Sequence, residues 1–223
     1  MDRDQFIANV RSAVEAVSRR SHELASPVRR RDGGPAGEDR FLLFRDCLEF
    51  AGGQAHRAAG SEKLREILGQ IIAGRNRLVA WGEDLPAGTR QVLSEFGVEW
   101  LPPLTLSPSN AEQGIPPSIT EAQVGITGAL LGVAETGSVV LASRPGENLL
   151  IASLSSIHVV LLGIDQLVVT LGDAFVRVPA MFPEGLPGNV AFISGPSRSA
   201  DIEQSLAIGA HGPMEVHVIV ISS

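Results

Sequence analysis

Residues 61–101, SEKLREILGQIIAGRNRLVAWGEDLPAGTRQVLSEFGVEWL, decide the fold class, because helical and strand patterns alternate within them. An amphipathic helix is predicted over residues 61–72, opened by a serine that can cap it, and residues 78–81 form the apolar run of a short buried strand. A second helix over residues 89–96 and a second strand over residues 98–101 repeat this order. Short strands separated by helices are typical of a parallel sheet covered on both faces. The stretch therefore predicts an α/β fold with a mainly parallel sheet flanked by helices.

Toward the N-terminus, the apolar residues of 4–24 lie near helical spacing, and residues 26–37 are rich in Pro, Gly and charge. We predict an N-terminal helix and linker over residues 1–40, followed by an α/β domain over residues 41–223. The domain opens with a helix over residues 40–50, which we interpret as a docking element. Its apolar residues share one helical stripe: Phe41, Phe44 and Leu48.

Beyond residue 100, residues 102–117 predict an irregular crossing between two halves of the domain, because they are rich in Pro, Ser and Asn. Residues 130–133 and 139–141 then predict a hairpin around the turn formed by residues 134–138. An apolar strand over residues 157–162 and a helix from about residue 165 follow.

The C-terminal end has the order of a βαβ unit. We predict a strand over residues 190–194, a helix over residues 199–208 and a final strand over residues 215–221.

Composition excludes several classes of function. The 223 residues carry a net charge of −7, from 18 basic and 25 acidic residues, which argues against a nucleic-acid-binding protein. No apolar run reaches the roughly 18 residues of a membrane span, so we predict a cytoplasmic protein. Cys47 is the one cysteine, and no His or carboxylate spacing suggests metal ligands, so we predict no metal site, no iron–sulfur cluster within this chain, and no cofactor.

The strongest candidate site lies in residues 193–201, ISGPSRSAD, where a strand leads through a loop into the predicted helix. Free N–H groups and the positive end of the helix dipole would meet there, which favours a carboxylate or phosphate ligand. The alternative is that the serines only cap the helix and the arginine pairs with the aspartate. The candidate ligand-binding residues are Gly195, Ser197, Arg198, Ser199 and Asp201.

A second candidate site is the turn AETGS, residues 134–138. Its glutamate, Glu135, is the candidate catalytic residue, because burial among apolar strands would raise its pKa toward acid–base work. The alternative is an exposed turn tip, for which Glu-Thr-Gly is ordinary chemistry. The neighbouring candidates for ligand binding are Thr136, Gly137 and Ser138.

The histidines divide into two kinds. His158 and His217 lie inside predicted strands, where a hydrogen-bonded structural role is favoured. His211, in GAHGP, follows the last predicted helix and is a further ligand-binding candidate, although it would lie at the opposite end of that helix from Arg198.

Several motifs together resemble those of the LUD (lactate utilization) domain family, over about residues 41–221. They are AETGS from residue 134, SIHV from residue 156, GPSRSADIE from residue 195 and GAHGP from residue 209. The resemblance implies a fold like that of ribose-5-phosphate isomerases, glucosamine-phosphate deaminases and CoA transferases. It also implies a role in oxidising L-lactate to pyruvate alongside two iron–sulfur partner proteins.

Two functions from different classes are compatible with these observations. The first is an accessory subunit of an iron–sulfur lactate oxidation system, with a small-anion or partner-binding site at residues 195–201. The second is a stand-alone isomerase or CoA-transferase-like enzyme that uses Glu135 as base or nucleophile. A scaffold without any ligand is the remaining alternative, and it predicts no anion binding.

Overall fold

The computed structural model describes residues 37–101, 115, 117–143, 149–200, 206–208 and 212–222, together with Gln5 and Ile7. Only the backbone is described for residues 198–200 and 206–208. The chain divides into two units, residues 1–33 and 34–223, and the helices and strands from residue 38 onward lie in the second. The predicted helix over residues 4–24, the linker and most of the crossing at residues 102–117 lie outside the described residues, as do Asp201 and His211. The predicted domain division at residue 40 stays a prediction.

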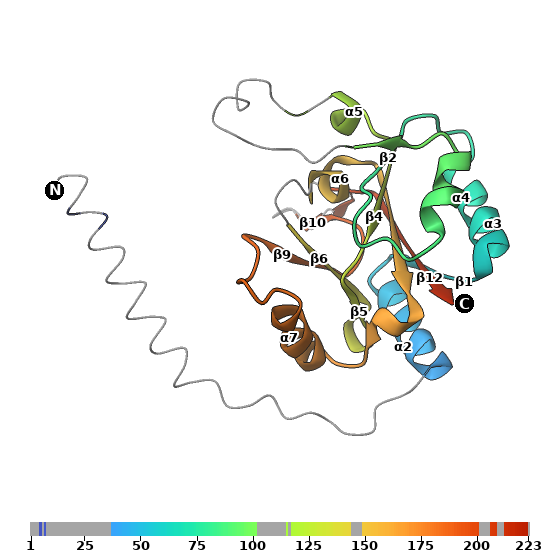
Figure 1. The fold of residues 1–223 in the computed structure, drawn as a ribbon. Helices are drawn as coiled ribbons and strands as arrows, with labels where there is room; N and C mark the ends of the chain where they lie inside the picture. The colour runs from blue at the N-terminus through green and yellow to red at the C-terminus, as the bar shows by residue number, and fades with distance from the viewer. Residues whose placement is uncertain are drawn as a thin grey trace. The chain divides into compact units, whose positions relative to one another are not determined.

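A six-stranded, fully parallel sheet forms the centre of this unit (Figure 1). This architecture confirms the α/β class and the mainly parallel sheet. In spatial order the strands are β1 (Gln54–Ala59), β12 (Glu215–Ser222), β7 (Ile157–Gly163), β4 (Val124–Gly128), β2 (Leu78–Ala80) and β3 (Glu99–Trp100).

One face of the sheet is covered by α3 (Gly60–Ile72) and α4 (Thr89–Glu95), the two helices predicted from residues 61–101 (Figure 1). The apolar stripe of α3 packs on strand residues such as Val124 and Val159. The expected serine cap is wrong, because α3 already begins at Gly60 and has no side-chain cap.

The other face is covered by α2 (Glu38–Phe50) and by a second sheet. The predicted stripe of α2 is confirmed, since Phe41, Phe44 and Leu48 are its buried residues. The second sheet has the order β8 (Leu167–Val168), β5 (Leu131–Val133), β6 (Ser138–Ala142), β9 (Val190–Ile193).

The second sheet contains the predicted hairpin, because β5 and β6 pair antiparallel around the short helix η2 (Ala134–Thr136). Its far side packs on α7 (Leu171–Ala180). The short helices α5 (Pro117–Thr120) and α6 (Leu149–Leu154) contribute to a further cluster near Trp81. The helix expected from residue 165 is instead one turn, η3 (Ile164–Gln166), and α7 begins only after the Thr170 cap.

The predicted helix over residues 199–208 is wrong. Backbone there forms two short antiparallel strands, β10 (Arg198–Ala200) and β11 (Leu206–Ile208). The physical reason lies at the ends of the segment, where the Ser197 N–H donates to the Pro213 carbonyl at 3.0 Å. A ten-residue helix would carry the chain about 15 Å away from this closure, whereas a hairpin returns the chain to it. The predicted C-terminal βαβ unit is therefore wrong as well.

Candidate functional site

The turn of the β5–β6 hairpin is seated on helix α2. Gly137 has φ 61°, and a Cβ on it would collide with the backbone of Cys47 and Leu48, so the turn requires glycine. The Cys47 Sγ–H donates a hydrogen bond to the Glu135 carbonyl at 3.4 Å. The close packing of this turn explains why glycine occupies residue 137.

Glu135 itself is exposed and is not buried among the apolar strands. Its Oε1 accepts a hydrogen bond of 2.6 Å from the backbone N–H of Leu171, the first residue of α7. A carboxylate in this position satisfies a free N–H and complements the helix dipole. Glu135 thus has the geometry of a helix-capping residue, and its catalytic role stays a prediction.

A chain of three hydroxyls joins the two candidate segments. Thr136 Oγ1 lies 2.7 Å from Ser138 Oγ, which lies 2.7 Å from Ser194 Oγ on the segment after β9. Ser138 is buried and Ser194 is exposed, so the chain leads from the interior to the surface. Two motifs that are 56 residues apart in sequence therefore meet in one place.

The segment after Ser194 continues across the end of α2. Gly195 packs so closely that a Cβ on it would lie 2.8 Å from the Ala51 carbonyl oxygen. Ser197 is hydrogen bonded through its backbone to Pro213, and Gly212 lies against its side chain. We call residues 136–138, 194–197 and 212–213 the motif surface.

The motif surface brings together five of the predicted site residues: Thr136, Gly137, Ser138, Gly195 and Ser197. It lies at the amino edge of the parallel sheet, since Pro213 lies two residues before β12 and the Met214 N–H donates to the Ser156 carbonyl just before β7. Arg198 and Ser199 continue from it into β10, and their side chains are not described.

The argument for an anion site at this surface loses its main support. No helix begins at Ser199, so the free N–H groups and the positive dipole end that would attract an anion are missing. The helix end that does lie here is the C-terminal end of α2, which presents carbonyl oxygens. The anion site stays a prediction that rests on Gly195, Ser197 and Arg198.

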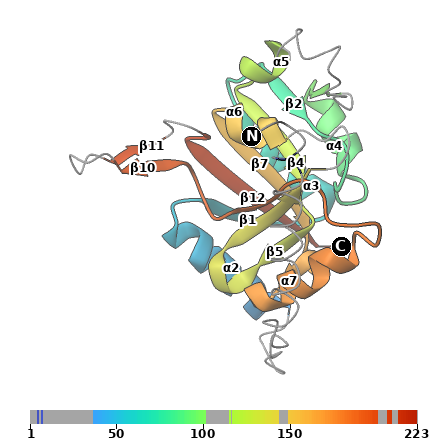
Figure 2. The ribbon, with the colours of Figure 1, turned by 90° about the vertical axis from the view of Figure 1, so that its left-hand side faces the viewer.

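Exposed apolar side chains flank the motif surface, a feature that the sequence patterns did not reveal. Phe50 at the end of α2 is 91% exposed, Met214 beside Pro213 is 54% exposed, and Leu154 at the end of α6 is 41% exposed. Figure 2 shows the β10–β11 hairpin projecting from the body at the end where β12 begins. Met214 lies one residue after the motif surface, and Phe50 directly precedes Ala51, which contacts Gly195.

The two strand histidines are buried and hydrogen bonded, as predicted. His158 Nε2 lies 2.9 Å from Thr127 Oγ1, and burial lowers the pKa of His158 to about 4. His217 Nδ1 lies 3.0 Å from His56 Nε2, and its own Nε2 lies 3.2 Å from Glu215. Burial, followed by the neighbouring His217, lowers the pKa of His56 to about 4.

Within the described part of the chain, no group of three or more His, Cys, Asp or Glu is arranged to hold a metal ion. The helices described there are also too short or too polar to cross a membrane.

Comparison with known proteins places these motifs in a family. The family model of the LUD domain matches residues 43–221. The chain belongs to the LUD domain family. A protein of Geobacillus sp. (strain WCH70) named lactate utilization protein C is 30% identical over 167 residues, covering 72% of this chain and 69% of that protein.

A second LUD-family relative, the lactate utilization protein C of Shouchella clausii (strain KSM-K16), is 39% identical over 101 residues, which cover 45% of this chain and 44% of that protein. Among solved structures, a DUF162 family protein from Deinococcus radiodurans has a TM-score of 0.60 at 19% identity. The match covers 85% of this chain and 100% of the other, and at this identity it shows the fold alone.

Proposed function

We propose that this LUD-domain protein takes part in lactate utilisation, as an accessory subunit of a system that oxidises L-lactate to pyruvate. The observation that carries the proposal is the long similarity to proteins named lactate utilization protein C, which includes one alignment over 72% of this chain. The described parts of three of the motifs that carry the resemblance, residues 136–138, 195–197 and 212–213, lie close together in the fold, which supports a shared task for them.

The electron-transferring groups of such a system belong to partner proteins. Cys47 is the single cysteine among 223 residues, whereas an iron–sulfur cluster is held by several thiolates. We therefore propose that this chain works beside iron–sulfur lactate utilisation proteins in the cytoplasm and docks on them.

The proposed docking site is the motif surface together with the exposed side chains that flank it. Its support is the projecting β10–β11 hairpin together with the exposed side chains of Phe50 and Met214. A small carboxylate or phosphate bound near Gly195, Ser197 and Arg198 is the other use that we propose for this surface.

Growth on L-lactate tests the role. Loss of this chain, in a strain without a second copy or another lactate dehydrogenase, is expected to stop growth on L-lactate and to spare growth on glucose. Normal growth on L-lactate would refute the proposal.

Substitutions in the same strain test the docking site. The double variant Phe50→Asp, Met214→Asp places charge on exposed positions and is expected to abolish growth on L-lactate. The matched control is Leu186→Asp, since Leu186 is also exposed, at 58%, but lies on the segment after α7. If the double variant grows on L-lactate as well as the control, the motif surface is not a docking site. If both variants fail to grow, the added charge disrupts the protein wherever it is placed, and the docking site has no support from this test.

Calorimetric titration with lactate, pyruvate, phosphate and CoA tests the anion site. A charge-assisted hydrogen bond from Arg198 predicts that Arg198→Ala weakens binding about tenfold to a hundredfold. No binding of any of the four, or binding unchanged by the substitution, would leave docking as the role of this surface.

A further inference from the structure

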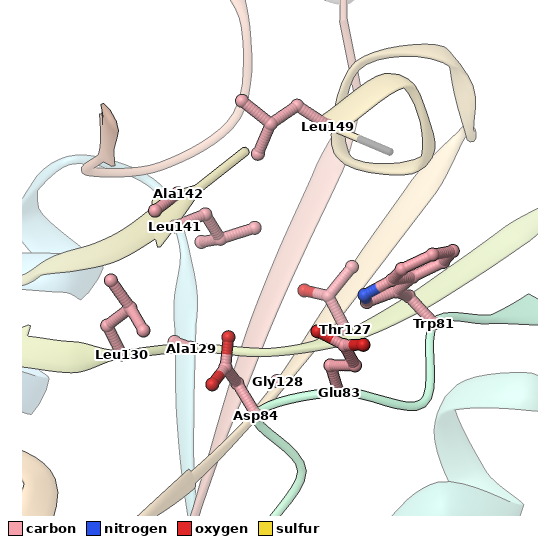
Figure 3. A pocket seen from close by; sticks show the side chains of 10 residues that line it. All are labelled: Trp81, Glu83, Asp84, Thr127, Gly128, Ala129, Leu130, Leu141, Ala142 and Leu149. Carbon is pink, nitrogen blue, oxygen red and sulfur yellow. The ribbon is translucent and has the colours of Figure 1, made fainter. Parts of the chain in front are cut away.

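A narrow pocket opens at the carboxyl edge of the parallel sheet, at the opposite end of the strands from the motif surface. Its interior offers about 20 Å³, which is room for one water-sized group such as a single oxygen atom of a ligand, and it opens to solvent. Trp81, just beyond β2, and Thr127 on β4 form its buried floor, and Leu130 and Leu141 form apolar walls (Figure 3). Ligands of parallel α/β proteins bind at this edge, so the pocket has the expected location for a site.

The indole nitrogen of Trp81 is a buried hydrogen-bond donor without an acceptor among the described residues. Trp81 is only 6% exposed, and no described residue accepts a hydrogen bond from its Nε1. Figure 3 shows Nε1 turned toward the Thr127 side of the pocket. Because an indole can only donate and a buried donor without a partner costs free energy, an oxygen atom from outside the described residues would be favoured here.

The Thr127 hydroxyl is the second polar group on the floor, and it is set by His158. Both side chains are buried, and 2.9 Å separates Thr127 Oγ1 from His158 Nε2. With its pKa lowered to about 4, the His158 ring is neutral at pH 7 and carries one proton.

The position of that proton decides what Thr127 offers to the pocket. His158 Nδ1 is buried and has no partner among the described residues. A proton on Nδ1 would leave a buried N–H without a hydrogen-bond acceptor, which is rarer in proteins than a buried acceptor without a donor. A proton on Nε2 is therefore favoured, and Nε2–H then donates to Thr127 Oγ1. The Thr127 O–H is left free to donate into the pocket.

The charges around the pocket limit the ligand further. Glu83 and Asp84 lie at its rim, and the described residues that line it include no lysine or arginine. The Glu83 carboxylate repels an anion, whereas two donors on the floor attract an acceptor oxygen. We propose that this pocket binds the carbonyl oxygen of a small uncharged molecule, with Trp81 Nε1 and Thr127 Oγ1 as the donors. This site is independent of the proposed role in lactate utilisation.

Tryptophan fluorescence tests the site in the full-length protein. The chain has two tryptophans, and Trp100 lies outside the pocket lining, against the Arg90 guanidinium at 4.4 Å, so Trp100→Phe leaves Trp81 as the reporter. The probes are methyl pyruvate and pyruvate, which share a ketone and differ in charge. Methyl pyruvate is expected to change the Trp81 emission saturably and to bind about tenfold more tightly than pyruvate. Glu83→Gln is expected to narrow the difference in affinity between methyl pyruvate and pyruvate.

Paired substitutions at Thr127 test the hydroxyl donor. Thr127→Val is expected to weaken methyl pyruvate binding about tenfold, whereas Thr127→Ser, which keeps the hydroxyl, should retain it. Circular dichroism checks that each variant is folded. Should the valine variant not fold, the indole N–H resonance of Trp81 in the Trp100→Phe protein gives a second measurement, and methyl pyruvate is expected to move it downfield.

Three results would overturn the proposal. The first is no saturable effect of methyl pyruvate on the emission or the indole N–H resonance, which would leave water as the occupant. The second is equal binding by folded Thr127→Val protein. The third is tighter binding of pyruvate than of its ester.

Discussion

Acidification is expected to destabilise this protein through His158, and His158→Gln is expected to remove that contribution. Burial lowers the folded-state pKa of His158 from about 6.5 to about 4. Between these two pH values His158 is therefore protonated in the unfolded chain and neutral in the folded protein. The contribution of neutral, buried His158 to the free energy of unfolding is fully present above pH 6.5 and is lost as the pH falls from 6.5 toward 4. It no longer changes below pH 4.

The magnitude is set by these two pKa values. Linkage predicts that His158 alone lowers the free energy of unfolding by about 2 kcal/mol between pH 7 and pH 5. Glutamine does not titrate in this range and can still hydrogen bond to Thr127, so the variant should lose about 2 kcal/mol less than the wild type over the same interval. The pKa values of His56 and His217 are also lowered, but both residues are present in both proteins and cancel in the comparison.

Urea denaturation at pH 7, 6 and 5 measures the difference directly. The reasoning would be refuted if wild type and His158→Gln lost the same free energy of unfolding. An NMR titration of the His158 ring provides a second check, because its Cε1–H resonance should stay constant down to about pH 5. Movement with a midpoint near 6.5 would mean that the imidazole is hydrated and not buried.

Three further substitutions, with one control, test the turn that carries the family motif and the helix on which it is seated. Glu135→Gln, measured by denaturation, should cost about 0.5–1 kcal/mol by weakening the cap on α7. It also tests the catalytic prediction, because loss of turnover with unchanged stability would support that role and intact turnover would refute it. Gly137→Ala should lower the free energy of unfolding by more than about 2 kcal/mol, because the added Cβ meets the α2 backbone. The control Gly74→Ala has a similar φ but nothing within 4 Å of the added Cβ, so it should cost only about 1 kcal/mol. Equal losses in the two variants would contradict the packing argument. Leu48→Ala should cost about 2–5 kcal/mol in a thermal or chemical melt, and a loss below 1 kcal/mol would show that α2 is not docked.

Periodicity predicted the elements whose apolar faces are regular. The stripe of α2 and the helix–strand alternation of residues 61–101 were readable because burial on one face imposes a repeat on the sequence. Strand β1 was missed for the complementary reason. Its sequence, QAHRAA, lies at the sheet edge and pairs only with β12, so it carries little apolar signal.

Local sequence patterns did not predict the secondary structure of a segment whose two ends are joined by a hydrogen bond between distant backbone groups. Residues 199–208 were predicted as a helix, but the Ser197–Pro213 hydrogen bond joins the ends of the segment and a hairpin forms between them. Glu135 is a similar case, because its exposure and its bond to Leu171 depend on where α7 begins.

The sequence by itself determined the α/β class, the parallel sheet and the motifs that mark the LUD family, because these depend on local periodicity and on runs of specific residues. Only the tertiary structure decided which motifs meet. The contact of Ser138 with Ser194, and the pairing of Thr127 with His158 beneath Trp81, join residues on different strands. Such contacts depend on which strands pair and in which register, and the strand order of a sheet leaves no periodic signal in the chain.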